Sequence, residues 1–281
     1  MKFRTLSIAP LCLLFAGLSL TPAPAALAQH EAGHVQGPSQ YQWLDNIGLK
    51  PGQLDAFAKA QSERVQALRA AHAPGYYLGL EAITGSNHVI FLSGFNSFAE
   101  AQKDHETIWN NTELAASLKA TTATQAPTIR DIHSSVYTYD KDLSLRPDLD
   151  ISKMRFMRIT LFQIRSGHLQ DWEHIVKLFA KAYETAIPEA HWAMFEKIYG
   201  EGSDSTYILA TPMESLSTID VMHADSKKFD ASVGKDQLQM LREQLSKVVK
   251  SSETDLFVMG PKISYVPQSW ITSSPDFWGK K

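Results

Sequence analysis

Three side chains in this sequence are candidates for acid–base chemistry. They are His133, Glu81 and Glu196, and each lies in a short strand-like run. A carboxylate or imidazole that is enclosed by the fold has a shifted pKa and can act as a general base. We therefore predict these three residues as candidate catalytic groups. The alternative is structural, with Arg158 neutralising one glutamate and the remaining charges solvated at strand ends.

A second set of side chains could bind a ligand. Successive side chains of a strand point to opposite faces of the sheet. If the more aliphatic set on each strand faces the helices, the other set faces the inside of the fold. Aromatic walls with a few polar groups are typical of small-molecule sites. The expected ligand is a small hydrophobic or aromatic molecule, and no motif requires a cofactor. The candidate ligand-binding residues are Tyr41, Trp43, Tyr77, Tyr137, Phe156, Arg158 and Trp192.

One short motif resembles a zinc site. His30-Glu31-Ala32-Gly33-His34 has the spacing in which two histidines one helical turn apart bind zinc beside a glutamate base. The motif contains glycine, runs into Gly37-Pro38 and has no apolar helix around it. We therefore predict no metal site here, and we interpret residues 29–39 as a flexible N-terminal tail.

Two further histidines, His105 and His223, each continue an apolar helical stripe. A histidine in such a stripe is most often a partly buried packing residue, and this is the prediction. A matched pair of ligands is the alternative.

The first 28 residues have the features of a secretory signal. Lys2 and Arg4 precede a short apolar run, and Ala26-Leu27-Ala28 supplies small residues for cleavage. We expect a periplasmic or secreted protein, cleaved near Ala28, with no membrane span in the mature chain, because the run is shorter than the roughly 20 residues of a span. Cys12 is the only cysteine, so the mature chain has no disulfide, thiolate catalyst or cysteine metal ligand.

The composition excludes some partners. Hydrophobic residues make up 44% of the chain and charged residues 20%, which is ordinary for a globular protein. Cleavage would leave 25 basic and 30 acidic residues, a net charge of −5, with no basic cluster. Because nucleic-acid binding needs clustered Lys and Arg, we expect no nucleic-acid partner.

The elements that position these residues occur twice. At an offset of 115 residues, Gly52 matches Gly167 and Glu81 matches Glu196, and a three-residue insertion near Glu201 changes the offset to 118. Each copy reads strand, amphipathic helix, two strands, helical stretch and strand. The first strands are expected at 41–49 and 154–164, and the last strands at 129–139 and 256–266.

This order is the ferredoxin-like split βαβ arrangement, which covers only one sheet face with helices. Two copies can therefore bury their open faces against each other. The fold class expected is α+β, with tandem ferredoxin-like repeats whose antiparallel sheets form one intramolecular pseudo-dimeric barrel. The expected parts are the signal (1–28), the tail (29–39), the first repeat (40–139), a linker (140–152), the second repeat (153–266) and a Trp-containing C-terminal tail (267–281).

The pattern resembles the dimeric α+β barrel superfamily in a fused tandem form, similar to its antibiotic-biosynthesis monooxygenase, EthD and NIPSNAP-like groups. The resemblance covers residues 40–266. It implies a pocket between sheet and helices, which the superfamily uses for cofactor-free oxygenation, haem degradation, lactone isomerisation or binding.

Three functions remain open from the sequence. The first is an exported protein that binds an unknown small molecule in an aromatic-lined pocket, and an oligomer is compatible with it. The second is a cofactor-independent monooxygenase or isomerase with a buried His or Glu as its base. The third is a structural or interaction protein with a solid barrel.

Overall fold

The computed structural model describes residues 37–202 and 204–280. The first half of this region contains four strands and three longer helices, with a short 3-10 turn before the last strand. These elements are β1 (Tyr41–Leu49), α1 (Leu54–Ala70), β2 (Leu78–Ala82), β3 (His88–Phe95), α2 (Phe98–Asn110), α3 (Thr112–Gln125), η1 (Ala126–Thr128) and β4 (Ile129–Leu145).

The second half repeats this order after a short connection and adds two C-terminal helices. Its elements are η2 (Ile151–Lys153), β5 (Phe156–Ile164), α4 (Leu169–Ala186), β6 (Trp192–Tyr199), β7 (Ser205–Met213), α5 (Ser217–Val233), α6 (Lys235–Val248), β8 (Val249–Met259), α7 (Gln268–Ser273) and α8 (Pro275–Trp278). The duplicated α+β arrangement predicted from the sequence is therefore present.

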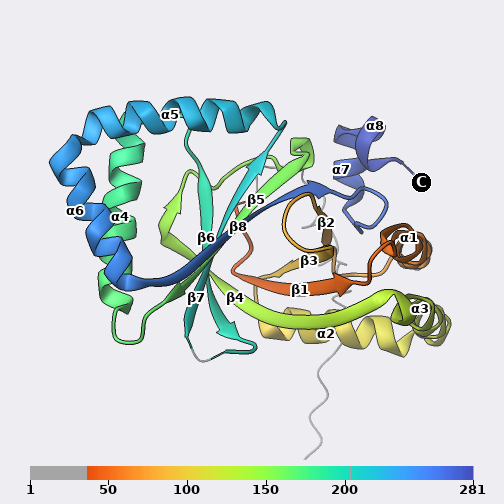
Figure 1. Ribbon diagram of the computed structural model, residues 1–281. Coiled ribbons are helices and arrows are strands. Elements are labelled where there is room, and N and C mark those ends of the chain that lie inside the picture. The colour runs from red at the N-terminus through yellow and green to blue at the C-terminus, as the bar shows by residue number, and fades with distance from the viewer. Residues whose placement is uncertain (1–36, 203, 281) are drawn as a thin grey trace, which may run out of the picture. The chain divides into compact units, whose positions relative to one another are not determined.

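The eight strands close into a single barrel. Their order around it is β1-β3-β2-β8-β5-β7-β6-β4, and every neighbouring pair is antiparallel. The two halves join at β2–β8 and at β4–β6, so each sheet edge of one half is paired with the other half. Figure 1 shows the wall with α1, α2 and α3 beside the first half and α4, α5 and α6 beside the second.

The two halves also share the turn that precedes their first long helix. Gly52 and Gly167 have φ angles of +72° and +83°, a left-handed conformation that glycine adopts without steric cost. Each lies just before a helix that presents one large aromatic residue to the sheet, Phe57 in α1 and Trp172 in α4. The sequence repeat therefore corresponds to a repeat of local geometry.

The interior of the barrel is filled by one apolar cluster. Because all eight strands contribute to this cluster, it lies inside the wall rather than under the helices. Its strand residues include Leu44, Leu80, Ile90, Tyr137, Ile159, Phe195, Ile208 and Phe257. The strand alternation predicted an aromatic-lined pocket inside the barrel. The interior is instead packed with this apolar cluster.

The prediction of side-chain orientation was wrong on four strands, β1, β2, β5 and β6. The aliphatic positions Leu80 and Ile159 face the interior, whereas Tyr77 and Arg158 face the helix side. The physical reason is that both faces of the sheet are buried, so alternation separates two sets of positions without showing which set is inside. On β4 the prediction was right for Tyr137, which lies in the interior cluster, but not for His133, whose side chain is 55% exposed.

Two boundaries differ from the expected ones. The last strand, β8, covers residues 249–259 rather than 256–266, and the following segment crosses the outside of β2, where Tyr265 pairs with Tyr77. Strand β4 continues to Leu145, so part of the expected linker belongs to the barrel wall. Each of these strands pairs with a strand of its own half and with one of the other half.

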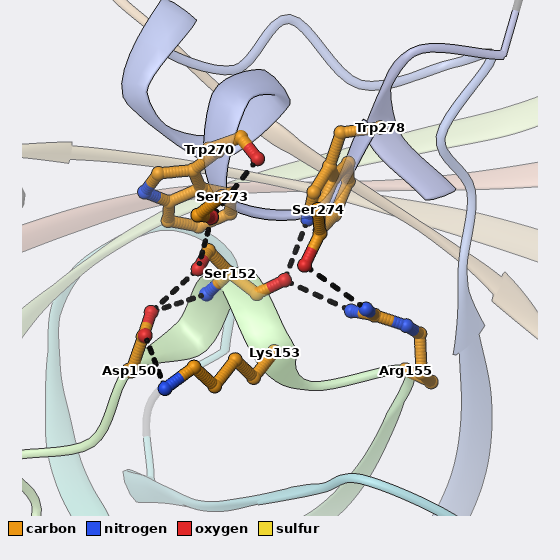
Figure 2. A network of polar contacts seen from close by, with 8 residues as sticks. All are labelled: Asp150, Ser152, Lys153, Arg155, Trp270, Ser273, Ser274 and Trp278. Atoms are coloured by element: carbon orange, nitrogen blue, oxygen red, sulfur yellow. Dashed lines mark hydrogen bonds and ion pairs between the residues drawn. The ribbon is translucent and has the colours of Figure 1, made fainter. Parts of the chain in front are cut away.

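The C-terminal helices α7 and α8 cover one end of the barrel. Trp278 has no exposed surface, belongs to the interior cluster and donates a hydrogen bond of 2.7 Å to the Ser152 carbonyl. Arg155 donates to the same carbonyl and to Ser274, and its guanidinium lies 4.1 Å from the centre of the Phe277 ring. Figure 2 shows this network, in which the tail binds the connection between the halves.

Candidate functional site

The outer face of the second-half sheet, beneath α4 and α5, holds most of the sequence candidates from that half. On β5, Arg158 lies directly opposite Thr211 of β7, and alternation places Phe156 on the same face. On β6, Trp192 contacts Tyr183 of α4, with ring centres 5.6 Å apart. These side chains share the layer between sheet and helices.

Arg158 has no bonding partner in this layer. Its Nε atom is buried and makes no hydrogen bond, and no ion pair or hydrogen bond joins its guanidinium to another residue within 37–202 or 204–280. The Arg158 side chain as a whole is half-buried, and its two terminal nitrogens keep some surface exposed to solvent. Burial lowers the pKa of Arg158, and the nearby Tyr183 counteracts this shift. A cation that is partly buried without a counter-ion is costly to retain.

The hydroxyl of Thr211 adds a second unsatisfied group. Thr211 is almost completely buried, and its Oγ1 atom has no hydrogen-bond partner among the described residues. Since directly opposed residues on antiparallel strands have Cβ atoms about 5 Å apart, this oxygen lies beside the Arg158 side chain.

Aromatic rings line the helix side of this pair. Tyr183 stacks on Phe229 of α5, with ring centres 4.2 Å apart and an angle of 16° between the planes. The edge of this stack meets Trp192, whose Nε1 donates to the Leu143 carbonyl at 2.9 Å. Burial raises the pKa of Tyr183, so this phenol stays neutral at neutral pH. We call Arg158, Thr211, Tyr183, Trp192 and Phe229 the Arg158 site.

The acidic residues nearest to the site are already paired. Asp225 and Asp230 of α5 both influence Tyr183 electrostatically. Asp225 binds Lys228 at 2.8 Å, and Asp230 binds Arg242 at 3.4 Å. These two pairs are neutral, which leaves Arg158 as an uncompensated positive charge.

Glu196 lies at the other end of the same layer. Its carboxylate accepts a hydrogen bond from Tyr207, the residue opposite it on β7, and burial raises its pKa. Trp172 packs on Tyr207, and its buried Nε1 is unpartnered. Met194 and Leu209, which oppose each other between the two ends, pack in the apolar cluster under α4. The structure therefore does not bring Glu196 and Arg158 together.

In the first half, Tyr77 and Glu81 lie on the corresponding outer face. Tyr77 accepts a hydrogen bond of 2.9 Å from Gln61, which itself accepts from Gln125 at 2.6 Å, and burial raises the pKa of Tyr77. Burial also raises the pKa of Glu81, and Asp55 raises it further. Tyr77 is thus satisfied by helix partners, as a packing residue would be.

Two further first-half candidates, Tyr41 and Trp43, lie on β1. Tyr41 contacts Phe95 and Phe98, and Trp43 is 44% exposed and donates to Asp45 at 3.2 Å. Trp43 occupies the position in β1 that Arg158 occupies in β5. The position equivalent to Arg158 therefore carries no cation in the first half, where the partly buried arginine with unpartnered nitrogens is instead Arg69 of α1.

The histidine candidates are at the surface. His133 has a side chain that is 55% exposed and lies 3.1 Å from Glu201 and 3.9 Å from Asp131. His105 and His223 are both exposed, so the prediction of partly buried packing residues was wrong for them. Their helices, α2 and α5, turn these positions outward rather than toward the sheet.

Metal and membrane features give two findings. Within the described ranges, no group of three or more His, Cys, Asp or Glu side chains is arranged to hold a metal ion. No helix in that part of the chain has the length and apolar character needed to cross a membrane. The His30–His34 motif and the signal-like segment lie outside the described residues.

Two open grooves lie elsewhere on the second half. One of about 750 Å³ runs between α5 and α6, and it is lined by Asp230, Leu238 and Arg242 among others. Its Leu238 belongs to the same apolar cluster as Phe229, so the groove adjoins the aromatic wall of the Arg158 site. A second groove, of about 440 Å³, lies between the end of β4 and α4 beside Lys177, Lys181 and Arg146.

Sequence reasoning missed Thr211, Tyr183 and Phe229. Tyr183 was visible only as one member of an amphipathic helical stripe, which predicts packing. Thr211 could have been found from the register of β5 and β7, since it pairs with Arg158, but single sequences do not define register. In the sequence, nothing distinguishes Phe229 from the other apolar residues of α5.

Comparisons with known proteins identify a fold rather than a close relative. No family model and no curated protein sequence matches the chain. An anthrone oxidase-like protein is 9% identical, with a TM-score of 0.53 over 82% of this chain and 92% of that one. A monooxygenase-like protein from Fusobacterium nucleatum is 11% identical, with a TM-score of 0.51 over 79% and 93%. A chlorite dismutase-like protein is 14% identical, with a TM-score of 0.49 over 79% and 95%.

These similarities agree with the closed barrel and its duplicated halves. At such low identities they show the fold alone. The chain therefore shares the fold of these structures, a closed α+β barrel, with both halves of the barrel supplied by one polypeptide.

Proposed function

We propose that this protein binds a small molecule in the sheet–helix layer of its second half, at the Arg158 site. The observation that carries the proposal is the guanidinium of Arg158, which is partly buried beside aromatic rings without any described partner. Folding does not retain such a group for stability, because an unpaired buried charge lowers it. A ligand that satisfied Arg158 would recover that cost on binding.

The composition of the site supports the same proposal. Small-molecule sites combine aromatic walls with a few convergent polar groups. Tyr183, Phe229 and Trp192 provide the wall, and Arg158 and Thr211 provide the polar groups. The barrel interior offers no comparable arrangement, since apolar side chains from every strand fill it.

The test is binding of a neutral fluorescent aromatic, 1-aminoanthracene, followed by its emission. We expect one bound probe per chain and weaker binding to Tyr183→Ala, which removes one wall of the site. Phe98→Ala is the matched control, because Phe98 is an exposed aromatic residue of the first half. Absence of binding, or equal effects of the two substitutions, would refute the proposal, once circular dichroism has shown that both variants fold.

A second candidate is a cofactor-independent oxygenase or isomerase built on the same layer. The observation that favours it is the raised pKa of Glu196, a half-buried carboxyl that could take a proton from a substrate. The oxidase-like and monooxygenase-like names of two similar structures support an oxygenase in particular. Oxygen uptake with a hydroxyaromatic compound, lost in Glu196→Gln, would establish this activity; no uptake leaves the binding proposal.

We also propose that the protein is exported, on the basis of the N-terminal pattern of residues 1–28. Expression of the full chain should yield a mature protein beginning at Gln29 outside the cytoplasm. Mass spectrometry of the recovered protein measures this start, and an intact Met1 would contradict export by cleavage.

A further inference from the structure

Resting on the proposed function, we infer that the ligand is an organic anion with a planar aromatic body. The negative charge and the flat shape of this ligand both follow from the residues that surround Arg158 in the described part of the chain.

The charge follows from the electrostatic environment. Arg158 is positive, and the two acids of α5 that approach the site are each paired with a surface cation, Lys228 or Arg242. A neutral ligand would leave the guanidinium uncompensated, whereas a carboxylate would neutralise it. Arginine suits this task because its fork of N–H groups matches the two oxygens of a carboxylate.

The geometry leaves those N–H groups available. The terminal nitrogens of Arg158 reach solvent, and no described residue bonds to them. The neighbouring Thr211 hydroxyl is buried on the same face of the sheet and has no described partner. The terminal nitrogens of Arg158 therefore fix where the acidic group would lie.

The planar body follows from the rings beside this point. Tyr183 and Phe229 form a nearly parallel stack, and Trp192 meets Tyr183 at 87°. Phe229 and Trp192 are buried, so the ring that this wall presents to a ligand is the half-buried Tyr183, whose flat surface favours a flat aromatic partner over a branched aliphatic one. Burial keeps the Tyr183 phenol neutral, so the wall does not repel an anion.

The number of sites follows from the repeat. The residue of β1 equivalent to Arg158 is Trp43, which is 44% exposed and bonds to the acidic Asp45. The first-half position is therefore suited neither by charge nor by enclosure to an anion. We therefore expect one anion at the Arg158 position and none at the equivalent position of the first half, even though the fold is duplicated.

The experiment compares 2-naphthoate with 2-naphthamide, its neutral analogue of nearly the same shape, by calorimetric titration. We expect the wild-type chain to bind one naphthoate at least 10-fold more tightly than the amide, as a charge-assisted hydrogen bond implies. Arg158→Met should remove this preference, because it weakens naphthoate binding far more than amide binding. Arg130→Met, which removes one exposed cation of the first half, should keep the preference.

Different outcomes separate this inference from the proposed function. Amide binding that depends on Tyr183, with no preference for naphthoate, would refute the anion and keep the binding site. A preference that survives Arg158→Met would also refute it. Binding of neither compound would overturn both proposals for aromatic ligands. If Arg158→Met does not fold, Arg158→Lys, which keeps the charge without the fork, should lower the preference without abolishing it.

Discussion

At the scale of single residues, the second half carries its chemistry on the helix-covered face of the sheet. Arg158 and Glu196 lie on that face and differ in how they are satisfied, since Tyr207 donates to Glu196 while Arg158 has no described partner. The difference separates a group that the fold stabilises from one that the fold leaves available. Only the second kind argues for a ligand.

The raised pKa of Glu196 predicts a pH dependence of stability. The folded chain holds this proton more tightly than the unfolded chain, whose glutamates titrate near about 4.3. Folding therefore takes up a proton between that value and the raised pKa, so the free energy of unfolding falls as pH rises through this window. Glu196→Gln should remove that part of the slope.

The measurement is thermal unfolding of both proteins at several pH values between 4 and 8. The variant should gain stability relative to wild type as pH rises. The exposed Glu63→Gln controls for the loss of one charge. Parallel curves for wild type and Glu196→Gln would show that the carboxyl is not held in this way.

At the scale of elements, the repeat in the sequence was sufficient to predict most strands and the closed barrel. The runs at 41–49, 88–93 and 205–210 correspond to β1, β3 and β7, because strands paired on both sides have clear apolar alternation. The last strand was displaced because residues 256–266 are also apolar, and only pairing with β5 shows that β8 begins at Val249. Orientation could not be predicted, since both faces of each sheet are covered.

The candidate site was predictable only in part, for a similar reason. Arg158 and Trp192 were identified by their residue types, but the face on which they lie depends on which apolar set fills the barrel. The helix residues that complete the site come from α4 and α5, and their position over the sheet is a tertiary property. A residue whose role depends on strand register, or on how a helix packs over the sheet, cannot be identified from the local sequence alone.

The C-terminal helices give a prediction for an element. Trp278→Ala should lower the free energy of unfolding by about 3–5 kcal/mol, as expected for a fully buried large aromatic residue. Part of the loss arises because the Ser152 carbonyl loses a donor. Urea unfolding measures the change, and Trp109→Ala, at a tryptophan that is 41% exposed, is the control. Equal effects of the two substitutions would mean that the tail does not pack as described.

At the scale of the whole molecule, the two halves form one cooperative structure. Each sheet edge of one half pairs with the other half, and the interior cluster includes side chains from both. Neither half can bury its inner sheet face alone. We therefore expect the chain to unfold in a single step, although it contains two repeats.

Leu80→Ala tests this expectation. Leu80 is completely buried in the shared interior, so its truncation should cost about 2–5 kcal/mol. Because the core is common, transitions followed by far-ultraviolet circular dichroism and by tryptophan fluorescence should shift together. Met240→Ala, at an exposed α6 residue, should leave the midpoint almost unchanged. Two separated transitions would indicate independent halves.

The duplication has a consequence for how such a chain can change. Interior positions related by the repeat hold apolar residues in both copies, as in Leu44 with Ile159, Leu80 with Phe195 and Ile90 with Ile208. The outer position of Trp43 and Arg158 differs in chemical class. The interior positions of the two copies pack against each other, so a change in one copy affects the other. The outer positions of one copy can change, and gain a different ligand specificity, without affecting the other copy. The first copy thus offers protein engineers an independent surface on which a different specificity could be built.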